Sequence, residues 1–310
     1  MFLRLRSSLS GTKIDFMRFH KSALVLSIFC IIASLILVFV RGLNFGIDFA
    51  GGILIEARMS ENVDVSEVRN VLAGEIKDVQ IQSAGTTDLL IRVTKTEEDQ
   101  SVIVKKIQDT LGKKFSNVEY RKIDYVGPQI GLELILKGFL ALLLSFVFIM
   151  IYIWVRFDWQ FGFGGIFALV HDTMLTLGFF SLTGLEFNLT SIAAILTIIG
   201  YSINDSVVIY DRIRENIRRY KKINLPDLIN SSLNSTLSRT VLTSGVVLFS
   251  ILALVIFGGE VLRSFSIATF FGIVVGTYSS IYISAPVLIY FDPRKEKVKL
   301  GTKANHKNSS

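Results

Sequence analysis

The sequence predicts an integral membrane protein with six transmembrane helices and one small α+β domain outside the bilayer. Of its 310 residues, 51% are hydrophobic, and the mean hydropathy is positive, which is too apolar for an ordinary soluble domain. Six separate apolar runs each approach the ~20 residues that a helix needs to cross the hydrocarbon core. One long polar segment, between the first and second runs, remains to form the outer domain.

The six predicted spans take up most of the chain. They are Ser22–Val40, Leu134–Val155, Phe163–Thr183, Leu189–Tyr210, Val241–Phe257 and Ser264–Tyr290. The rest divides into an N-terminal segment (residues 1–21), an outer domain (41–133), a basic loop (211–240) and a basic tail (291–310). Because the number of spans is even, both ends of the chain are expected on the same side of the membrane.

Basic residues set the predicted orientation. The net charge is +7, and Lys and Arg are concentrated before the first span, between the fourth and fifth, and after the sixth. Cytoplasmic loops are enriched in Lys and Arg, so segments 1–21, 211–240 and 291–310 are predicted to be cytoplasmic. Nucleic-acid binding is the weaker interpretation, because no aromatic interleaving or binding motif accompanies the charge.

The outer domain contains six segments with strand or helix patterns. In order they are Ile53–Arg58 (strand), Asp64–Ile76 (helix), Val79–Ser83 and Leu89–Val93 (strands), Glu98–Leu111 (helix) and Val118–Tyr125 (strand). The order βαββαβ is typical of the ferredoxin-like arrangement. The segment shows no nucleophile–base pair and no Gly-rich phosphate loop, so we expect it to contact another protein.

Two carboxylates, Asp172 and Asp205, lie inside predicted spans. A carboxylate at the centre of a membrane helix costs about 2.5–3.5 kcal/mol on insertion scales, so each needs a reason. Both lie on stripes of small or polar residues with helical spacing, which are predicted to face protein or trapped water. The stripes are Gly165, Ala168, Asp172 and Thr176, and Thr190, Thr197, Tyr201 and Asp205. Asn204 is turned about 100° away and needs a different neighbour.

Each acid has two interpretations. In the structural one, the carboxylate only hydrogen-bonds neighbouring helices, and for Asp172, which follows His171, this is as good as the functional one. In the functional one, Asp205 takes up and releases a proton, as intramembrane acids do in pumps. Arg239, at the cytoplasmic mouth of the fifth span, is the candidate cation, although an inside-facing anchor explains its position equally well.

The sixth span carries a small residue at every fourth position. These residues are Ala268, Gly272, Gly276, Ser280 and Ser284. Such a pattern predicts a close-packing seam rather than a chemical site. Pro286, beyond it, is expected to kink the end of the span.

Short motifs stand at fixed places relative to the spans. They are Gly46–Gly52 (GIDFAGG), Val126–Gly131 (VGPQIG), His171–Asp172, Gly200–Ser206 (GYSINDS), Tyr210–Asn216 (YDRIREN) and Ser238–Thr240 (SRT). Together they resemble the SecF family, the smaller half of the SecD–SecF accessory complex of bacterial protein export. The resemblance covers residues 18–292. Within the motifs we single out as structural positions Gly46, Asp48, Gly51, Gly52, Gly127, Pro128, His171, Gly200 and Asn204.

The resemblance implies one half of a pseudo-symmetric unit with the fold of the resistance–nodulation–division transporters, completed by SecD. It implies a subunit of the bacterial inner (plasma) membrane that uses the proton-motive force to help preproteins through SecYEG. Contacts with SecA and YidC through the complex are implied as well. In the family, the acid of the Gly-Tyr-Ser-x-Asn-Asp motif and the arginine of the Arg-Thr motif belong to the proton path. They fall on Asp205 and Arg239, and Asp172 is a further candidate.

The sequence supports three alternative functions less well. A passive scaffold of the translocon has little need for an acid that is costly to insert. A small-molecule exporter half of the same superfamily would carry a large outer domain. An intramembrane protease is disfavoured because no Gly-x-Gly-Asp tetrapeptide occurs in the third or fourth span. We therefore expect no enzyme activity, no cofactor besides the proton gradient and, with three scattered histidines and one cysteine, no metal site.

Overall fold

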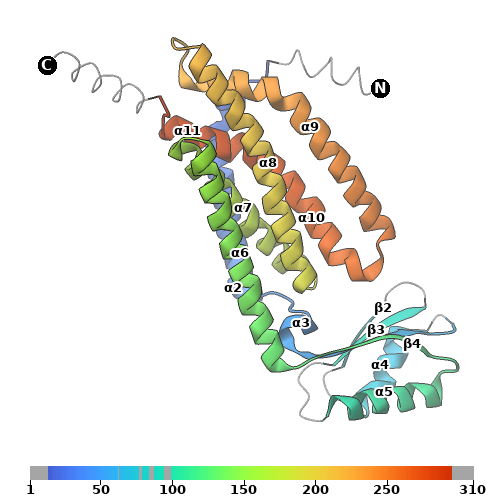
Figure 1. The fold of residues 1–310 in the computed structure, drawn as a ribbon. Coiled ribbons are helices and arrows are strands. Elements are labelled where there is room, and N and C mark those ends of the chain that lie inside the picture. The colour runs from blue at the N-terminus through green and yellow to red at the C-terminus, as the bar shows by residue number, and fades with distance from the viewer. Residues whose placement is uncertain (1–12, 62, 77–78, 84–86, 94–98, 295–310) are drawn as a thin grey trace.

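A computed structural model of the chain describes residues 13–61, 63–76, 79–83, 87–93 and 99–294. Within these residues, six helices are long and apolar enough to cross a membrane, as predicted. They run side by side in a bundle, and the outer domain lies at one end of it (Figure 1). The basic tail at 295–310 and residues 1–12 of the N-terminal segment, both predicted to be cytoplasmic, lie outside the described residues.

Five of the spans are continuous helices and the sixth is interrupted. The spans are α2 (His20–Arg41), α6 (Pro128–Arg156), α7 (Trp159–Thr183), α8 (Leu189–Arg219), α9 (Leu225–Phe257) and the series α10 (Gly259–Ser279), η2 (Ser280–Ser284) and α11 (Ala285–Tyr290). A short 3₁₀ turn, η1 (Met17–Phe19), precedes α2.

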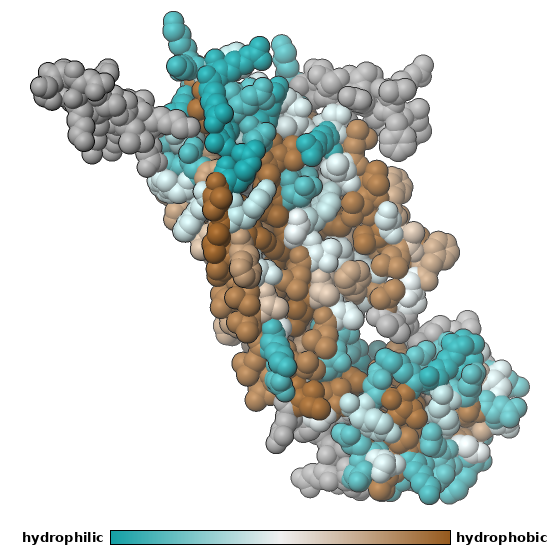
Figure 2. Space-filling model, in the orientation of Figure 1, coloured by the Kyte–Doolittle hydropathy of each residue, from teal (hydrophilic) through white to brown (hydrophobic). Residues whose placement is uncertain are grey.

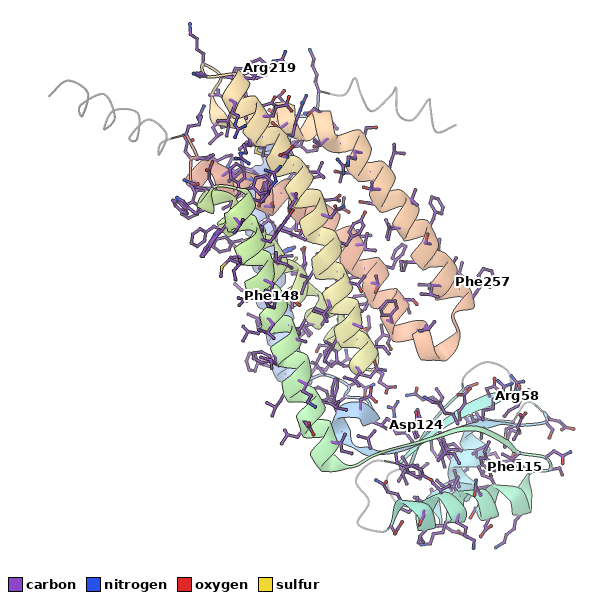
Figure 3. All side chains as sticks on the ribbon, in the orientation of Figure 1. Arg58, Phe115, Asp124, Phe148, Arg219 and Phe257 are labelled. Carbon is purple, nitrogen blue, oxygen red and sulfur yellow. The ribbon has the colours of Figure 1, made fainter. Side chains whose placement is uncertain are left out.

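The outside of the bundle is apolar. Large apolar side chains such as Phe148 on α6 and Phe257 on α9 are exposed, at 66% and 84%. Figure 2 shows this hydrophobic surface between a hydrophilic end of the bundle and the hydrophilic outer domain. In Figure 3, Phe148 lies along the length of α6 and Arg219 marks the hydrophilic end of α8. An apolar belt of this size is covered by lipid rather than by water.

Most of residues 211–240 are helical, which corrects the expectation of a loop over the whole range. Helix α8 continues to Arg219, α9 begins at Leu225, and only residues 220–224 connect them. The two helices pack through a buried row of Ile and Leu side chains, and Asn216 Nδ2 donates to Ser232 Oγ at 2.8 Å. Of the basic residues that suggested a loop, Arg218, Arg219 and Arg239 are exposed on these helices, and Lys221 and Lys222 lie in the short connection. Hydropathy alone missed both extensions because amphipathic helices carry polar faces.

The sixth span contains a wide turn where a kink was expected. Pro286 has no N–H to donate to the carbonyl of residue 282, and the five residues of η2 form a π-helical turn just before it. The interruption therefore has an identifiable cause in the sequence.

The small residues of α10 and η2 form a close-packing seam, as predicted, and the helix that they contact is α8 of the same chain. A methyl group built on Gly272 would overlap Ile198, and one built on Gly276 would lie 3.1 Å from Ser202 Cβ. Ala268, Ser280 and Ser284 are fully buried. The seam lets two helix backbones approach closely, which brings the polar residues of α8 and α10 together.

The outer domain has the predicted ferredoxin-like order. Its elements are β1 (Gly52–Arg58), α4 (Val65–Ala73), β2 (Val79–Ser83), β3 (Asp88–Val93), α5 (Gln100–Lys114) and β4 (Glu119–Val126). The four strands form an antiparallel sheet in the order β2-β3-β1-β4. Alternate residues of β1, Ile53, Ile55 and Ala57, are fully buried in the domain core. Figure 1 shows α4 and α5 on the side of the sheet that faces away from the bundle.

Candidate functional site

Two clusters of polar side chains lie inside the bundle, one around Asp172 and one around Asp205. The two residues are buried, with 0% and 3% of their surface exposed. Helices α8 and α10 contribute to both clusters, α7 to the first and α9 to the second. No hydrogen bond within the described part of the chain connects the clusters.

The Asp172 carboxylate is held from three helices. Ser202 Oγ on α8 and Ser279 Oγ on α10 lie 2.6 Å and 2.8 Å from Oδ2. His171 Nδ1, on the same helix as Asp172, lies 2.9 Å from Oδ1. Each oxygen therefore has a partner at normal hydrogen-bond distance, and the side chain is fixed in place.

The imidazole of His171 is buried beside this carboxylate. Its ring lies 6.1 Å from that of Tyr278, whose hydroxyl donates to the carbonyl of Ala23 on α2 at 3.0 Å. His171 Nε2 is buried and has no hydrogen-bond partner among the described residues. The first cluster thus extends from α8 to α2 through aromatic and polar contacts.

Asp205 has a much looser environment. Its Oδ2 lies 3.5 Å from Ser244 Oγ on α9, which is at the limit of a hydrogen bond. The Ser244 hydroxyl lies 3.1 Å from the Tyr201 hydroxyl and 2.9 Å from Thr277 Oγ1 on α10. Asp205 therefore borders a group of three hydroxyls, each of which can donate or accept a proton.

Arg239 precedes Ser244 on α9 by somewhat more than one helical turn. Its charge acts on Asp205, but its guanidinium forms no ion pair or hydrogen bond within the described part of the chain. The side chain is exposed in this chain, whereas the next residue, Thr240, is buried. The position of Arg239 therefore fits both a cation that acts on Asp205 and a charged anchor at the end of the span.

The predicted stripes are only partly brought together. On α7, Gly165, Ala168 and Thr176 are buried with Asp172, as predicted. On α8, Tyr201 joins Asp205 through Ser244, but Thr197 is exposed and its hydroxyl donates to the carbonyl of Ala193. A stripe at intervals of seven and four turns slowly around a helix, so its ends face different neighbours.

A second stripe of α8 remains uncovered in this chain. We call it the polar face of α8, and it consists of Ala193, Thr197, Gly200 and Asn204. The four residues are exposed and follow each other at intervals of four, three and four, so they lie on one side of the helix. A bare amide in hydrocarbon is costly, so this face requires a protein neighbour.

The glycine-rich motif after α2 lies where the outer domain meets the bundle. It forms the short helix α3 (Ile47–Ala50), and Asp48 Oδ2 accepts a hydrogen bond from the N–H of Leu189, the first residue of α8, at 3.0 Å. Gly51 and Gly52 have φ of +71° and +130°, which side chains other than glycine rarely adopt. They turn the chain from α3 into β1.

The second glycine motif packs against the first. A Cβ at Gly131 would lie 2.6 Å from the carbonyl oxygen of Phe49, so α6 can lie against α3 only without a side chain there. Gly127 is the N-cap of α6 and Pro128 is its first residue, a place that proline favours. Both motifs therefore build the junction between the outer domain and the bundle.

Sequence reasoning missed four hydroxyl residues of the two clusters. Ser202 and Ser279 hold Asp172, whereas Ser244 and Thr277 border Asp205. Each is a polar residue inside an apolar span, which is the signal that could have drawn attention to it. The pairing itself depends on how α8, α9 and α10 pack, which no single span reveals.

The arrangement can bind and release protons but offers no other visible chemistry. Within the described residues, no three His, Cys, Asp or Glu side chains come together in a way that could hold a metal ion. An acid with one long hydrogen bond, next to three hydroxyls, can change its protonation when the helices shift.

Comparison with known families gives two matches along the chain. Residues 106–294, more than half of the sequence, match the family described as protein export membrane protein SecD/SecF, C-terminal. Residues 36–63 match the SecD/SecF GG motif. The second match contains Gly46–Gly52, the segment that forms α3 and the turn into β1.

Two known relatives of similar length are both protein translocase subunits SecF. The protein translocase subunit SecF of Rickettsia rickettsii (strain Sheila Smith) is 53% identical over 292 residues, which cover 92% of this chain and 94% of the relative. That of Rickettsia bellii (strain OSU 85-389) is 54% identical over 286 residues, covering 91% and 94%.

Solved structures show the same fold within a longer chain. SecDF from Thermus thermophilus, described as a translocon-associated membrane protein, superposes with a TM-score of 0.83 at 36% identity. The match covers 91% of this chain but only 39% of that one. The chain therefore belongs to the SecD/SecF family of protein-export membrane proteins, and within that family to the SecF subunits.

Proposed function

We propose that this chain works with a SecD chain and uses the proton-motive force to help complete preprotein translocation through SecYEG. The observation that carries the proposal is Asp205, a carboxylate buried inside a membrane span with one long hydrogen bond. An acid that is costly to insert and poorly held there suits a change of protonation during a working cycle better than a fixed structural role.

The contrast with Asp172 supports this assignment. Asp172 has three partners at 2.6–2.9 Å on three helices, so moving it breaks several bonds at once. Asp205 has one hydrogen bond to a described residue, at 3.5 Å, so it can move with little loss of hydrogen bonding. Asp205 is therefore the proton carrier, and Asp172 holds α7, α8 and α10 together around it.

The energy available is sufficient for a conformational switch. Moving one charge through the membrane potential is worth about 2.3 kcal/mol per 100 mV. Such a bias shifts a two-state equilibrium if Asp205 is neutral in one state and charged in the other. Arg239, whose guanidinium has no partner within the described residues, supplies the positive charge that approaches Asp205 in only one of the states.

A second helical half must complete the site. The polar face of α8 is uncovered, and this chain spans 39% of the SecDF chain that it matches. A SecD chain with its own six spans would place a helix against Asn204 and Gly200. Interaction with SecA and YidC would then occur through the assembled complex.

The chain would lie in the bacterial inner membrane with both termini in the cytoplasm. Arg212, Arg214, Arg218 and Arg219 gather at the end of α8 that is far from the outer domain. Cytoplasmic loops attract Lys and Arg, so that end is the cytoplasmic one and the outer domain is on the opposite side.

Asp205→Asn tests the proposal, because it keeps the size of the side chain and removes its charge. The assay is preprotein translocation into vesicles that contain SecYEG, SecA, a SecD chain and this chain, with and without a proton gradient. We expect Asp205→Asn to insert at normal abundance and to lose the gradient-dependent stimulation.

Asp211→Asn is the matched control. Asp211 lies on the same helix, is exposed and pairs with Arg156 at 3.2 Å. This variant should keep the stimulation. Full stimulation with Asp205→Asn at normal abundance would leave the acid with a structural role and the chain as a passive scaffold.

A further inference from the structure

The sheet of the outer domain is tied to the bundle by an ion pair. Arg92 on β3 is 5% exposed, and its Nη2 donates to Glu186 Oε2 in the connection between α7 and α8. Glu186 is the one charged partner of Arg92 within the described residues. A buried guanidinium that loses such a partner is strongly destabilising, because the charge is then left unpaired away from water. The ion pair is therefore expected to break only when the whole outer domain moves and carries Arg92 away from Glu186.

Glu186 belongs to a short segment that is fixed on both sides. Phe187, the next residue, packs against Phe49 of α3 and Phe180 of α7 with ring centroids 5.8 Å and 5.2 Å apart. Its N–H donates to the carbonyl of Asn44, and its carbonyl accepts from the N–H of Gly46, at 2.7 Å and 2.9 Å. The segment after α2 and the segment before α8 thus form one unit.

This unit holds the first turn of α8. Asp48 accepts from the N–H of Leu189, and the Asn188 side chain accepts from the N–H of Ser191 at 3.1 Å. A carboxylate at a helix N-terminus satisfies a free N–H and interacts favourably with the helix dipole. Asp205 lies 16 residues after Leu189 on the same continuous helix, which is about 24 Å along its axis.

We infer that Arg92, Glu186 and Asp48 form a coupling joint that makes the outer domain and α8 move as one body. The inference rests on the proposed function in one respect, the change of protonation at Asp205. A shift of α8 when Asp205 gains or loses a proton is then passed to the outer domain, and pulling on the outer domain acts back on Asp205, because coupling is reciprocal. The three residues are positioning residues and do not themselves carry protons.

Two independent substitutions loosen the joint. Glu186→Gln keeps the size of the side chain and removes its charge. Gly46→Ala acts from the other side, because a methyl group at this position would overlap Glu186 Oε1, while the φ of Gly46, −70°, suits alanine. The exchange Arg92→Glu with Glu186→Arg restores opposite charges in reversed positions.

The controls remove similar features elsewhere in the outer domain. Asp88→Asn breaks the ion pair of Asp88 with Arg58, which lies within the sheet. Gly74→Ala adds a methyl group where nothing lies within 4 Å. Among the described residues, Asp88 pairs with Arg58 and Arg121, which are not part of the joint.

Spin labels measure whether the domain is held. They are placed on the full chain at Lys105→Cys, exposed on α5, and Ser250→Cys, exposed on α9, after Cys30→Ala removes the one native cysteine. We expect a single narrow distance distribution in the unmodified joint and in both controls. Glu186→Gln and Gly46→Ala should broaden it, and the charge exchange should narrow it again. An unchanged distribution in Glu186→Gln and Gly46→Ala would overturn the joint.

The transmission is tested with Asp205→Asn in the same labelled chain. We expect Asp205→Asn to shift the distance between the labels when the joint is intact, and Asp205→Asn with Glu186→Gln to show no such shift. A shift that persists without Glu186, or no shift with it, would overturn the coupling. Neither measurement uses a gradient or SecYEG, so its failure is distinct from a failure of the translocation assay.

Discussion

The two buried acids differ in how many partners each has, and this decides their expected roles. Asp172 is hydrogen-bonded by His171, Ser202 and Ser279, whereas the part of the chain that the structure describes gives Asp205 one hydrogen bond, from Ser244 at 3.5 Å. Both positions were visible in the sequence as carboxylates within apolar spans. Their difference was not, because the partners come from helices up to 107 residues away along the chain.

Asp172→Asn should destabilise the protein. An asparagine amide has one acceptor oxygen where the carboxylate has two. Its NH₂ group would therefore face at least one of the three groups that now donate to Asp172, and a broken buried hydrogen bond costs about 1–3 kcal/mol. We expect a lower midpoint of thermal unfolding in detergent. Asp211→Asn, at a side chain that is 61% exposed, should change it little. Equal midpoints for Asp172→Asn and the unsubstituted protein would contradict the structural role.

Asp88 in the outer domain predicts a pH-dependent stability. Hydrogen bonds from Arg58, at 2.6 Å and 2.9 Å, followed by the charges of Arg58 and Arg121, hold the pKa of Asp88 below its ordinary value of 3.8. A lowered pKa in the folded state stabilises the fold fully above 3.8, and this contribution disappears as the pH falls through the folded-state value.

Asp88→Asn should therefore make the outer domain less stable than in the unsubstituted protein at pH 7. The difference in stability between the two proteins should shrink as the pH falls below 3.8. The protection of outer-domain amides against hydrogen exchange, corrected for intrinsic rates, measures this on the full chain. A difference that stays the same at every pH would mean that the ion pair does not link folding to protonation.

At the scale of elements, the sequence patterns located spans and strands well where one face is uniformly apolar. All six strands and helices of the outer domain appear close to their predicted bounds, since alternation and 3.6-residue periodicity determine which side is buried. The extensions of α8 and α9 beyond their predicted spans were missed because charged residues in α8, and mainly Asn, Ser and Thr in α9, lowered their mean hydropathy. The helix α3 was missed because four residues give no periodic signal.

Three hydrogen bonds to α9 hold the described part of the N-terminal segment. The N–H groups of Ile14 and Met17 donate to the side chains of Asn234 and Asn230 on α9, at 2.9 Å and 3.1 Å. Asn234 Nδ2 also donates to the carbonyl of Ile14 at 2.8 Å. The two asparagines lie about one helical turn apart, and both form hydrogen bonds to the backbone of the segment.

Asn230→Ala with Asn234→Ala should release this segment. Each lost bond is worth about 0.5–1.5 kcal/mol, so the open population should rise about tenfold or more. Trypsin cleavage after Arg18 should accelerate accordingly when opening is faster than cleavage. Ser231→Ala, at an exposed position on the same helix, should cleave like the original chain. Unchanged cleavage in the double variant would mean that Phe16 and Met17, both 5% exposed, hold the segment alone.

At the scale of the whole molecule, charge placement predicts orientation. The end of the bundle away from the outer domain carries the arginines of α8, and an even number of spans predicts that both termini lie on the same side of the membrane. The composition and motifs of the sequence were enough for the six-span fold and the family. The junction between the outer domain and the bundle was not predictable. In the sequence Arg92 is an ordinary strand residue, and only the folded chain brings it to Glu186, 94 residues later.

Reporter fusions check the orientation. A reporter inserted at Asp88 should be active only outside the cytoplasm, and one fused after Ser310 only inside it, because the basic segments retain their side of the membrane. Fusions in the basic connection at Lys221 and Lys222 serve as a second cytoplasmic point. Activity of the Asp88 and Ser310 reporters on the same side would refute the six-span topology.

The polar face of α8 has a consequence for the life of the protein in the cell. A newly inserted copy that has not met its partner exposes Asn204 and Gly200 to hydrocarbon. An amide in that medium pairs with whatever donor or acceptor it finds, which marks the copy as unassembled. Membrane quality control removes such subunits, so the steady-state amount of this chain should follow the supply of its partner rather than its own rate of synthesis. Subunit stoichiometry would then be set by turnover.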